Sequence, residues 1–124
     1  MLASAKAMAT LAVKDLGKAR TFYEEKLGLR PQNADTREAT YATGGAILLL
    51  YRSDHAGTNR ATAVTWNLGT TLDETVTALA QKGVTFEHYN LPNLKREGDV
   101  HVAGDVRLAW FKDLDGNIHA LMNR

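Results

Sequence analysis

The sequence contains no cysteine, and this absence excludes several functional classes at once. Without cysteine there is no disulfide framework, no thiolate nucleophile and no cysteine-ligated zinc or iron–sulfur site. A charge excess is also lacking, because 15 Lys and Arg stand against 14 Asp and Glu and leave a net charge of +1. Because the charges balance so closely, the protein has no overall electrostatic field that could hold nucleic acid or an anionic membrane. We therefore expect neither nucleic acid nor a membrane as a partner.

Long hydrophobic runs are missing as well. The longest run, residues 46–51, is far too short to cross a membrane, and residues 1–8 lack the apolar stretch of a signal peptide. These features predict a cytoplasmic protein. The chain of 124 residues is 44% hydrophobic, which excludes disorder and allows a core of its own. We expect a single domain over residues 1–124.

The first half of the chain alternates between strand-like and helix-like patterns. Apolar residues recur at helical spacing over residues 16–27, and Gly28 stands where such a helix would end. Gly44 and Gly45 separate two apolar runs, which indicates a hairpin. The first half is therefore predicted to contain a strand, a helix and three further strands. The strands are expected at residues 8–13, 29–33, 40–42 and 46–52.

The second half is interpreted as the same order. Residues 71–74 have the form of a capping box that opens a helix, and Gly83 closes it. Strands are predicted at residues 62–68, 84–89, 100–103, 106–112 and 118–122, one more than in the first half, with a polar loop at 90–98. The agreement of two segments indicates a duplicated βαβββ module, at residues 7–55 and 60–124, in an α+β fold. Two unrelated α+β halves are the alternative.

Two motifs on this pattern resemble a known superfamily. Residues 11–16 (LAVKDL), followed by residues 22–29 (FYEEKLGL), are similar to the opening of vicinal oxygen chelate proteins. These include glyoxalase I, the bleomycin-resistance proteins, the fosfomycin-resistance enzymes and the extradiol dioxygenases. Residues 109–117 (AWFKDLDGN) resemble the second hallmark, with Leu114 in place of the usual proline. The resemblance spans residues 8–122 and implies two curled mixed sheets around a concave, ligand-holding cleft.

The resemblance also implies four metal ligands, which this sequence does not supply. The enzymatic members place His, Gln or Glu on the first strand and Glu on the fourth strand of each module. The matching positions here carry Met8, Leu49 (Leu48 in a register shifted by one), Ala63 (Ala61 if the preceding turn is counted differently) and Ala120. A thioether is a poor partner for a hard divalent ion, and leucine and alanine cannot ligate at all. We therefore predict no metal and no cofactor.

The histidines are the remaining candidates for a metal. They lack the short spacing that is typical of a metal site, and alternation puts His119 on the face opposite Ala120. A non-standard site built from them stays open as an alternative. The four residues are His55, His88, His101 and His119.

Strand alternation predicts which residues line the cleft. If the four apolar positions face it, every second residue on the same strands does too. The predicted lining is Met8, Thr10, Ile47, Leu49, Tyr51, Ala63, Thr65, His101, Leu108, Trp110, Ala120 and Met122. Such a surface suits a planar or apolar molecule, with Tyr51 and Trp110 as walls and Arg107 as a further polar anchor. Trp110 has a core position as its alternative, whereas Trp66 is expected under the second helix.

Three functions follow from these features. The first is binding of a small hydrophobic or aromatic molecule without a metal, as the bleomycin-resistance branch does. The alternative is a lyase, isomerase or dioxygenase that uses a non-standard metal set, or acid–base chemistry by Tyr51 or His101. The third is a structural role, with the cleft filled by its own side chains. The resemblance further implies a homodimer.

Overall fold

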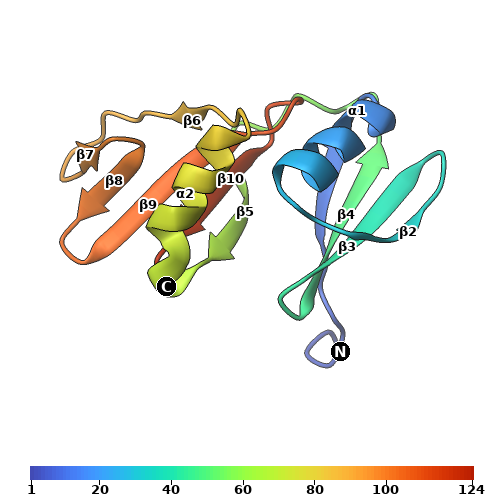
Figure 1. Ribbon diagram of the computed structural model, residues 1–124. Helices are drawn as coiled ribbons and strands as arrows, with labels where there is room; N and C mark the ends of the chain where they lie inside the picture. Colours follow the sequence, from blue (N-terminus) through green and yellow to red (C-terminus); the bar gives the residue numbers. More distant parts are fainter. The chain divides into compact units, whose positions relative to one another are not determined.

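The computed structural model describes residues 1–124 and divides into two compact units, Met1–Thr58 and Asn59–Arg124. Each unit holds one mixed β-sheet with helical turns on one of its faces (Figure 1). None of the helices is long and apolar enough to cross a membrane.

The first unit is a four-stranded sheet in the order β1-β4-β3-β2. Strand β1 runs parallel to β4, and the remaining pairs are antiparallel. The helical segment lies between β1 and β2 in the chain. The elements are β1 (Ala9–Val13), α1 (Leu16–Thr21), η1 (Phe22–Lys26), β2 (Pro31–Ala34), β3 (Glu38–Thr43) and β4 (Ala46–Arg52).

The helical segment of this unit differs in form from the predicted helix 16–27. Helix α1 begins at Asp15, whose carboxylate accepts a hydrogen bond from the Lys18 N–H at 3.0 Å. After Thr21 the chain widens into the π-helix η1, where the Leu27 N–H donates to the Phe22 carbonyl at 3.2 Å. Two adjacent aromatic residues, Phe22 and Tyr23, lie in this wider turn, and both are buried.

The core of the first unit follows the alternation of its two central strands. Leu11 and Val13 of β1 are buried, and so are Leu48 and Leu50 of β4. Since adjacent residues on a strand point to opposite faces, the intervening positions lie on the face away from the core. This open face carries the residues that the sequence predicts for the cleft.

The second unit repeats the arrangement with two additional short strands. Its sheet order is β5-β10-β9-β8-β7, and β6 pairs with β9. Strand β5 is parallel to β10, as β1 is to β4 in the first unit. The pairs β10–β9 and β9–β8 are antiparallel. This order confirms the predicted fold class of two βαβββ-like mixed sheets. The elements are β5 (Thr62–Asn67), η2 (Gly69–Thr71), α2 (Leu72–Gln81), β6 (Phe86–Glu87), β7 (Lys95–Glu97), β8 (Val100–Ala103), β9 (Val106–Lys112) and β10 (Ile118–Met122).

Three local predictions in this unit are wrong. The predicted loop 90–98 contains strand β7, which pairs with β8, and the predicted strand 84–89 shortens to the two residues of β6. The capping box is also absent, because Thr71 has φ −92° and ψ 5° as part of the 3₁₀ turn η2. A capping side chain needs extended backbone. The Thr71 hydroxyl instead donates to the Leu68 carbonyl at 2.7 Å.

Candidate functional site

The open face of the first sheet carries five of the predicted lining residues. Leu49 of β4 is flanked by Thr10 of β1 and Thr40 of β3, and its side chain is half-buried. Tyr51 lies further along β4 and is 38% exposed, and Met8 is 48% exposed. Met8 and Ile47 line one hollow of about 300 Å³ together with Lys6 and the β3–β4 turn. The surface is apolar with hydroxyl groups between the apolar side chains.

The open face of the second sheet carries most of the other predicted lining residues. Ala120 of β10 lies between Thr65 of β5 and Trp110 of β9 in the strand register. In the next such row, Met122 pairs with Leu108, and Leu108 pairs with His101 of β8. The register therefore brings these residues to one face of the sheet.

Ala63 departs from this arrangement. Thr62 pairs with Ile118 and Val64 pairs with the next residue, His119, so Ala63 is the additional residue of a β-bulge. Its direction does not follow from simple alternation, because a bulge interrupts the period of two on which that inference rests.

Trp110 belongs to an aromatic cluster on the open face. Its ring meets that of His101 edge-to-face at 4.9 Å and 77°, and that of Tyr89 at 5.1 Å and 67°. Trp110 itself is half-buried, whereas His101 has no exposed surface. Sequence reasoning missed Tyr89. The signal lies in Glu87, which pairs with Trp110, because alternation carries the same face on to Tyr89.

One hydrogen bond defines the protonation of His101. The Tyr89 N–H donates to Nε2 of His101 at 2.9 Å, so the ring carries its proton on Nδ1. Burial lowers the pKa of His101 and keeps the ring neutral, although the nearby backbone of Leu108 opposes this shift. No group forms a hydrogen bond of good geometry with Nδ1. The cluster thus contains a buried, neutral imidazole beside the backbone of Leu108.

The face of the second sheet toward α2 holds the other buried histidine. His119 has no exposed surface, and its ring stacks on Phe111 at 4.7 Å and 6°. Trp66 donates from Nε1 to Nδ1 of His119 at 3.0 Å, which places Trp66 on this face as expected. Burial lowers the pKa of His119 to about 4, and Asp113 opposes the shift. His119 is therefore a neutral core residue.

Arg107 also lies toward α2, and the expectation that it anchors a ligand beside His101 is wrong. Arg107 is adjacent to Leu108, which shares the face of His101, so alternation puts Arg107 on the opposite face. Its guanidinium donates from Nη2 to Asp73 at 2.7 Å and from Nη1 to Glu97 at 3.1 Å. These two ion pairs tie β9 to α2 and to β7.

The donors in this structure do not fit the divalent metal that the resemblance implies. The four positions that the resemblance matches to the metal ligands hold thioether or hydrocarbon side chains, and no group of three or more His, Asp or Glu side chains could hold a metal ion. His88 contacts Asp99 at 2.7 Å, but its other ring nitrogen accepts from Arg96 at 3.0 Å. Both ring nitrogens of His88 are therefore engaged, and neither offers a lone pair to a metal ion.

Comparisons with known proteins agree with this architecture. No curated protein sequence matches the chain significantly. Among solved structures, the chain resembles the fosfomycin resistance protein FosX from Mesorhizobium loti, with a TM-score of 0.71, 16% identity, and 100% and 94% of the two chains covered. It resembles FosX from Listeria monocytogenes complexed with Mn(II) and sulfate, with a TM-score of 0.70, 19% identity and 98% and 90% coverage.

Lactoylglutathione lyase from Agrobacterium tumefaciens is similar as well, with a TM-score of 0.69, 19% identity and 96% and 92% coverage. At these identities the likeness establishes the fold. The family model described as glyoxalase/bleomycin resistance protein/dioxygenase superfamily matches residues 7–119, which is nearly the whole chain. The chain therefore belongs to the glyoxalase/bleomycin resistance protein/dioxygenase superfamily.

Proposed function

We propose that this protein binds a small apolar or aromatic molecule without using a metal ion. The observation that carries the proposal is the chemistry of the four positions at which the superfamily's enzymes hold their metal. The resemblance matches these positions to Met8, Leu49, Ala63 and Ala120, and none of these residues offers an oxygen or an imidazole nitrogen. One such change would be compatible with a different ligand set, but four changes remove every protein ligand.

The chemistry of the open faces supports the same proposal. Leu49 and Ile47 present half-buried aliphatic surface, and Trp110 presents part of a large aromatic ring. Removing apolar surface from water contributes roughly 25 cal/mol per Å², so a planar hydrocarbon gains most of its affinity from area. The Thr10 and Thr65 hydroxyls are exposed and supply hydrogen bonds that orient the ligand.

The similar structures do not identify the ligand of this chain. The Listeria protein is complexed with Mn(II), whereas the positions of this chain fit no such ion. We therefore do not extend fosfomycin resistance to this chain. A ligand held by stacking and burial requires no Lewis acid, and the proposal includes no chemical step.

Thermal unfolding in the presence of a chelator tests the proposal. The purified protein would be dialysed against EDTA and melted with a panel of planar aromatics such as 4-nitrophenol, cinnamate and 1-naphthol. A binder at 100 times its dissociation constant adds about 2.7 kcal/mol to the free energy of unfolding, which raises the melting temperature by several degrees. Neutral polyols of similar mass serve as the control panel and should leave the melting temperature unchanged.

Two outcomes would contradict this function. A stoichiometric transition metal in the protein as purified, together with stabilisation that EDTA abolishes and Mn(II) restores, would favour the metal-dependent enzyme. Conversion of a bound compound, followed by mass spectrometry, would replace binding with catalysis. Stabilisation by aromatics that persists in EDTA, with the ligand recovered unchanged, is the result expected here.

A further inference from the structure

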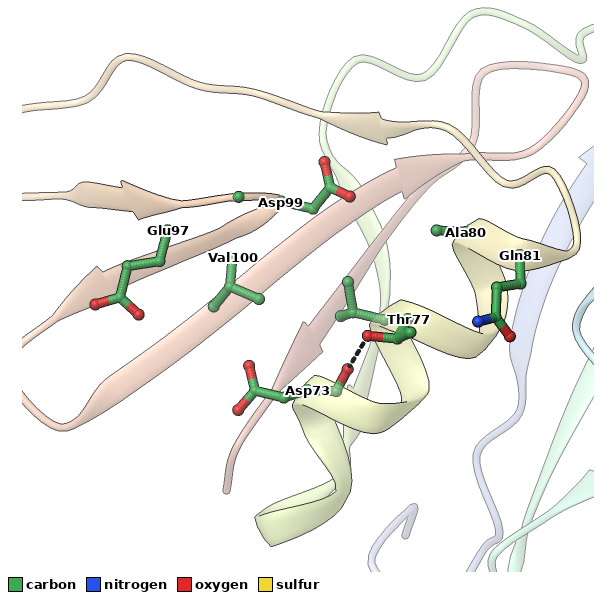
Figure 2. A pocket seen from close by; sticks show the side chains of 9 residues that line it. Asp73, Thr77, Ala80, Gln81, Glu97, Asp99 and Val100 are labelled. Atoms are coloured by element: carbon green, nitrogen blue, oxygen red, sulfur yellow. Dashed lines mark hydrogen bonds between the residues drawn. The ribbon is translucent and has the colours of Figure 1, made fainter.

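A groove in the second unit lies on the α2 side of the sheet, away from the open face. It runs between α2 and the β7–β8 hairpin and has a volume of about 510 Å³ (Figure 2). Val76 and Ala80 of α2 and Val100 of β8 line it, and both valines are buried. Pockets for small molecules usually measure about 300–1,000 Å³ and have an apolar lining, so this groove has the size and the floor of one.

Carboxylates stand around this apolar floor. Figure 2 shows Asp73 on α2 and Glu97 at the end of β7, with Asp99 beyond it in the hairpin turn. Arg107 is shared between the first two, at 2.7 Å from Asp73 and 3.1 Å from Glu97. Both carboxylates stay largely exposed, at 61% and 64%, so each keeps an oxygen within reach of a further partner.

The charge of Asp99 is not balanced by its nearest neighbour. His88 contacts Asp99 through Nε2 at 2.7 Å, while Arg96 donates to Nδ1 of the same ring at 3.0 Å. Because Arg96 can only donate, Nδ1 accepts from it in this arrangement and Nε2 donates to Asp99. Three carboxylates therefore stand beside two arginines, and one negative charge is left at the rim of the groove.

The walls offer few other partners to a ligand. The Thr77 hydroxyl is already engaged, because it donates to the Asp73 carbonyl at 3.1 Å, as the dashed line in Figure 2 shows. Gln81 presents its amide near the end of α2. An occupant that satisfies this surface combines a positive charge for the rim with a hydrocarbon body for the floor.

We propose that this groove binds a small organic cation, an ammonium group attached to an apolar body. The apolar body covers Val76, Ala80 and Val100, and the ammonium group lies among the carboxylates of the rim. Because these carboxylates are partly exposed, water screens the attraction and the charge contributes only about two- to fivefold to affinity. This site is separate from the open faces and does not depend on the function proposed for them.

Nuclear magnetic resonance on the full chain tests this site with two matched probes. Phenethylammonium carries the charge, and 2-phenylethanol has the same body without it. We expect phenethylammonium to shift the methyl resonances of Val76 and Val100 saturably at low salt. The alcohol should bind the same methyls about two- to fivefold more weakly. Equal affinity for both probes, or no shift at millimolar phenethylammonium, would overturn the proposal.

Amino-acid substitutions test separately the contribution of the charged rim and that of the apolar floor to binding. Asp99→Asn removes one charge at nearly constant shape, and it should bring the affinity for phenethylammonium toward that for the alcohol. Ala80→Leu fills the floor and should abolish binding of both probes. Glu74→Gln is the control, since Glu74 is an exposed carboxylate of α2 that does not line the groove.

The controls also identify other occupants. Equal loss in Glu74→Gln and Asp99→Asn would reduce the effect to general electrostatics and overturn the site. A short lysine-containing peptide that shifts these methyls where phenethylammonium does not would assign the groove to a protein partner instead. Melting curves of each variant confirm that a loss of binding is not a loss of folding.

Discussion

The two buried histidines each accept one hydrogen bond, but they lie on opposite faces of the second sheet. His119 accepts from the Trp66 indole and stacks on Phe111, so it is held as part of the core under α2. His101 accepts from the Tyr89 N–H, and its Nδ1–H donor lacks a hydrogen bond of good geometry. Both rings are enclosed by protein, but His101 lies in the aromatic cluster of the open face, whereas His119 lies in the core under α2.

The low pKa of His119 predicts an acid-sensitive fold. Its folded pKa of about 4 lies below the ordinary value of 6.5, so over this interval the unfolded chain binds a proton that the native state excludes. The contribution of neutral His119 to stability is complete above pH 6.5. It declines by about 3 kcal/mol as the pH falls to 4.

Urea unfolding at a series of pH values measures this loss. His119→Gln keeps an acceptor for Trp66 but cannot titrate, so its stability should fall less between pH 6.5 and 4 than that of the parent protein. Changing the exposed His55 to Gln serves as the control and should retain the parent's pH dependence. Parallel pH profiles for the parent and His119→Gln would contradict the assignment.

Restoring metal ligands in the first unit should not restore metal binding. The double variant Met8→His and Leu49→Glu supplies two donors, but Ala63 and Ala120 still supply none. The new carboxylate stands on a half-buried position between Thr10 and Thr40, so we expect a loss of roughly 1–2 kcal/mol of stability.

Leu49→Gln in place of Glu is the matched control, because it differs only by the charge. Metal content after dialysis against Mn(II) or Zn(II) provides the second measurement. A stoichiometric ion in the double variant would show that the remaining ligands come from elsewhere in the chain.

Most of the predicted lining could be placed from the sequence because strands alternate with a fixed period. Thr10, Leu49 and Trp110 fall on the faces that alternation gives them. Prediction from alternation failed where a bulge breaks this period, and where a charged side chain forms ion pairs with residues of other elements. Ala63 belongs to a bulge, and Arg107 is held by two carboxylates that lie far from it in sequence. Neither feature leaves a local pattern in the sequence.

At the scale of secondary-structure elements, the two α-helices begin in different ways. Asp15 has extended backbone and caps the amide of Lys18, as a short polar residue before a helix usually does. Thr71 precedes α2, but the 3₁₀ turn η2 comes first and leaves Thr71 outside the extended region. Helix α2 starts without side-chain capping, and its first turn carries Asp73 and Glu74 toward the positive end of the helix dipole.

This difference predicts unequal effects of two alanine substitutions. Asp15→Ala should cost about 1 kcal/mol, because the Lys18 amide loses its acceptor. Thr71→Ala should cost less, about 0.5 kcal/mol, since the hydroxyl satisfies only a loop carbonyl. Urea unfolding at neutral pH measures both values. A larger loss for Thr71→Ala would mean that the capping box forms in solution.

The elements themselves were predictable where their patterns are long. Strands β4, β8, β9 and β10 begin and end at the predicted residues. Strand β7 was missed because Lys95, Arg96 and Glu97 are all charged and exposed, so it shows no apolar alternation. The π-helix was missed because a helix with one wider turn has nearly the same spacing of apolar residues as a regular one.

At the scale of the whole molecule, the repeated strand order is the most informative feature. Both sheets place the first strand parallel to the last and continue antiparallel from there. This repetition was predictable because two halves of the sequence carry the same order of elements. The βαβββ duplication and the two sequence motifs together identified the superfamily that the family model matches.

We propose that the protein is a homodimer, as the resemblance implies. Exposed apolar side chains, such as Met8 at 48% and Leu114 at 62%, offer apolar surface that a second chain would cover. Light scattering over a dilution series should give twice the mass of 13.6 kDa at micromolar concentration. A stable mass of one chain throughout the series would contradict this proposal.

Fluorescence of single-tryptophan variants tests metal-independent binding at the open face most directly. The chain has two tryptophans, so Trp66→Phe leaves only Trp110 as the reporter on the open face, and Trp110→Phe leaves only Trp66 under α2. With EDTA present, a planar quencher such as 4-nitrophenol should quench Trp110 saturably and leave Trp66 nearly unchanged. Quenching of Trp110 that requires added Mn(II), or saturable quenching of Trp66 alone, would contradict the account.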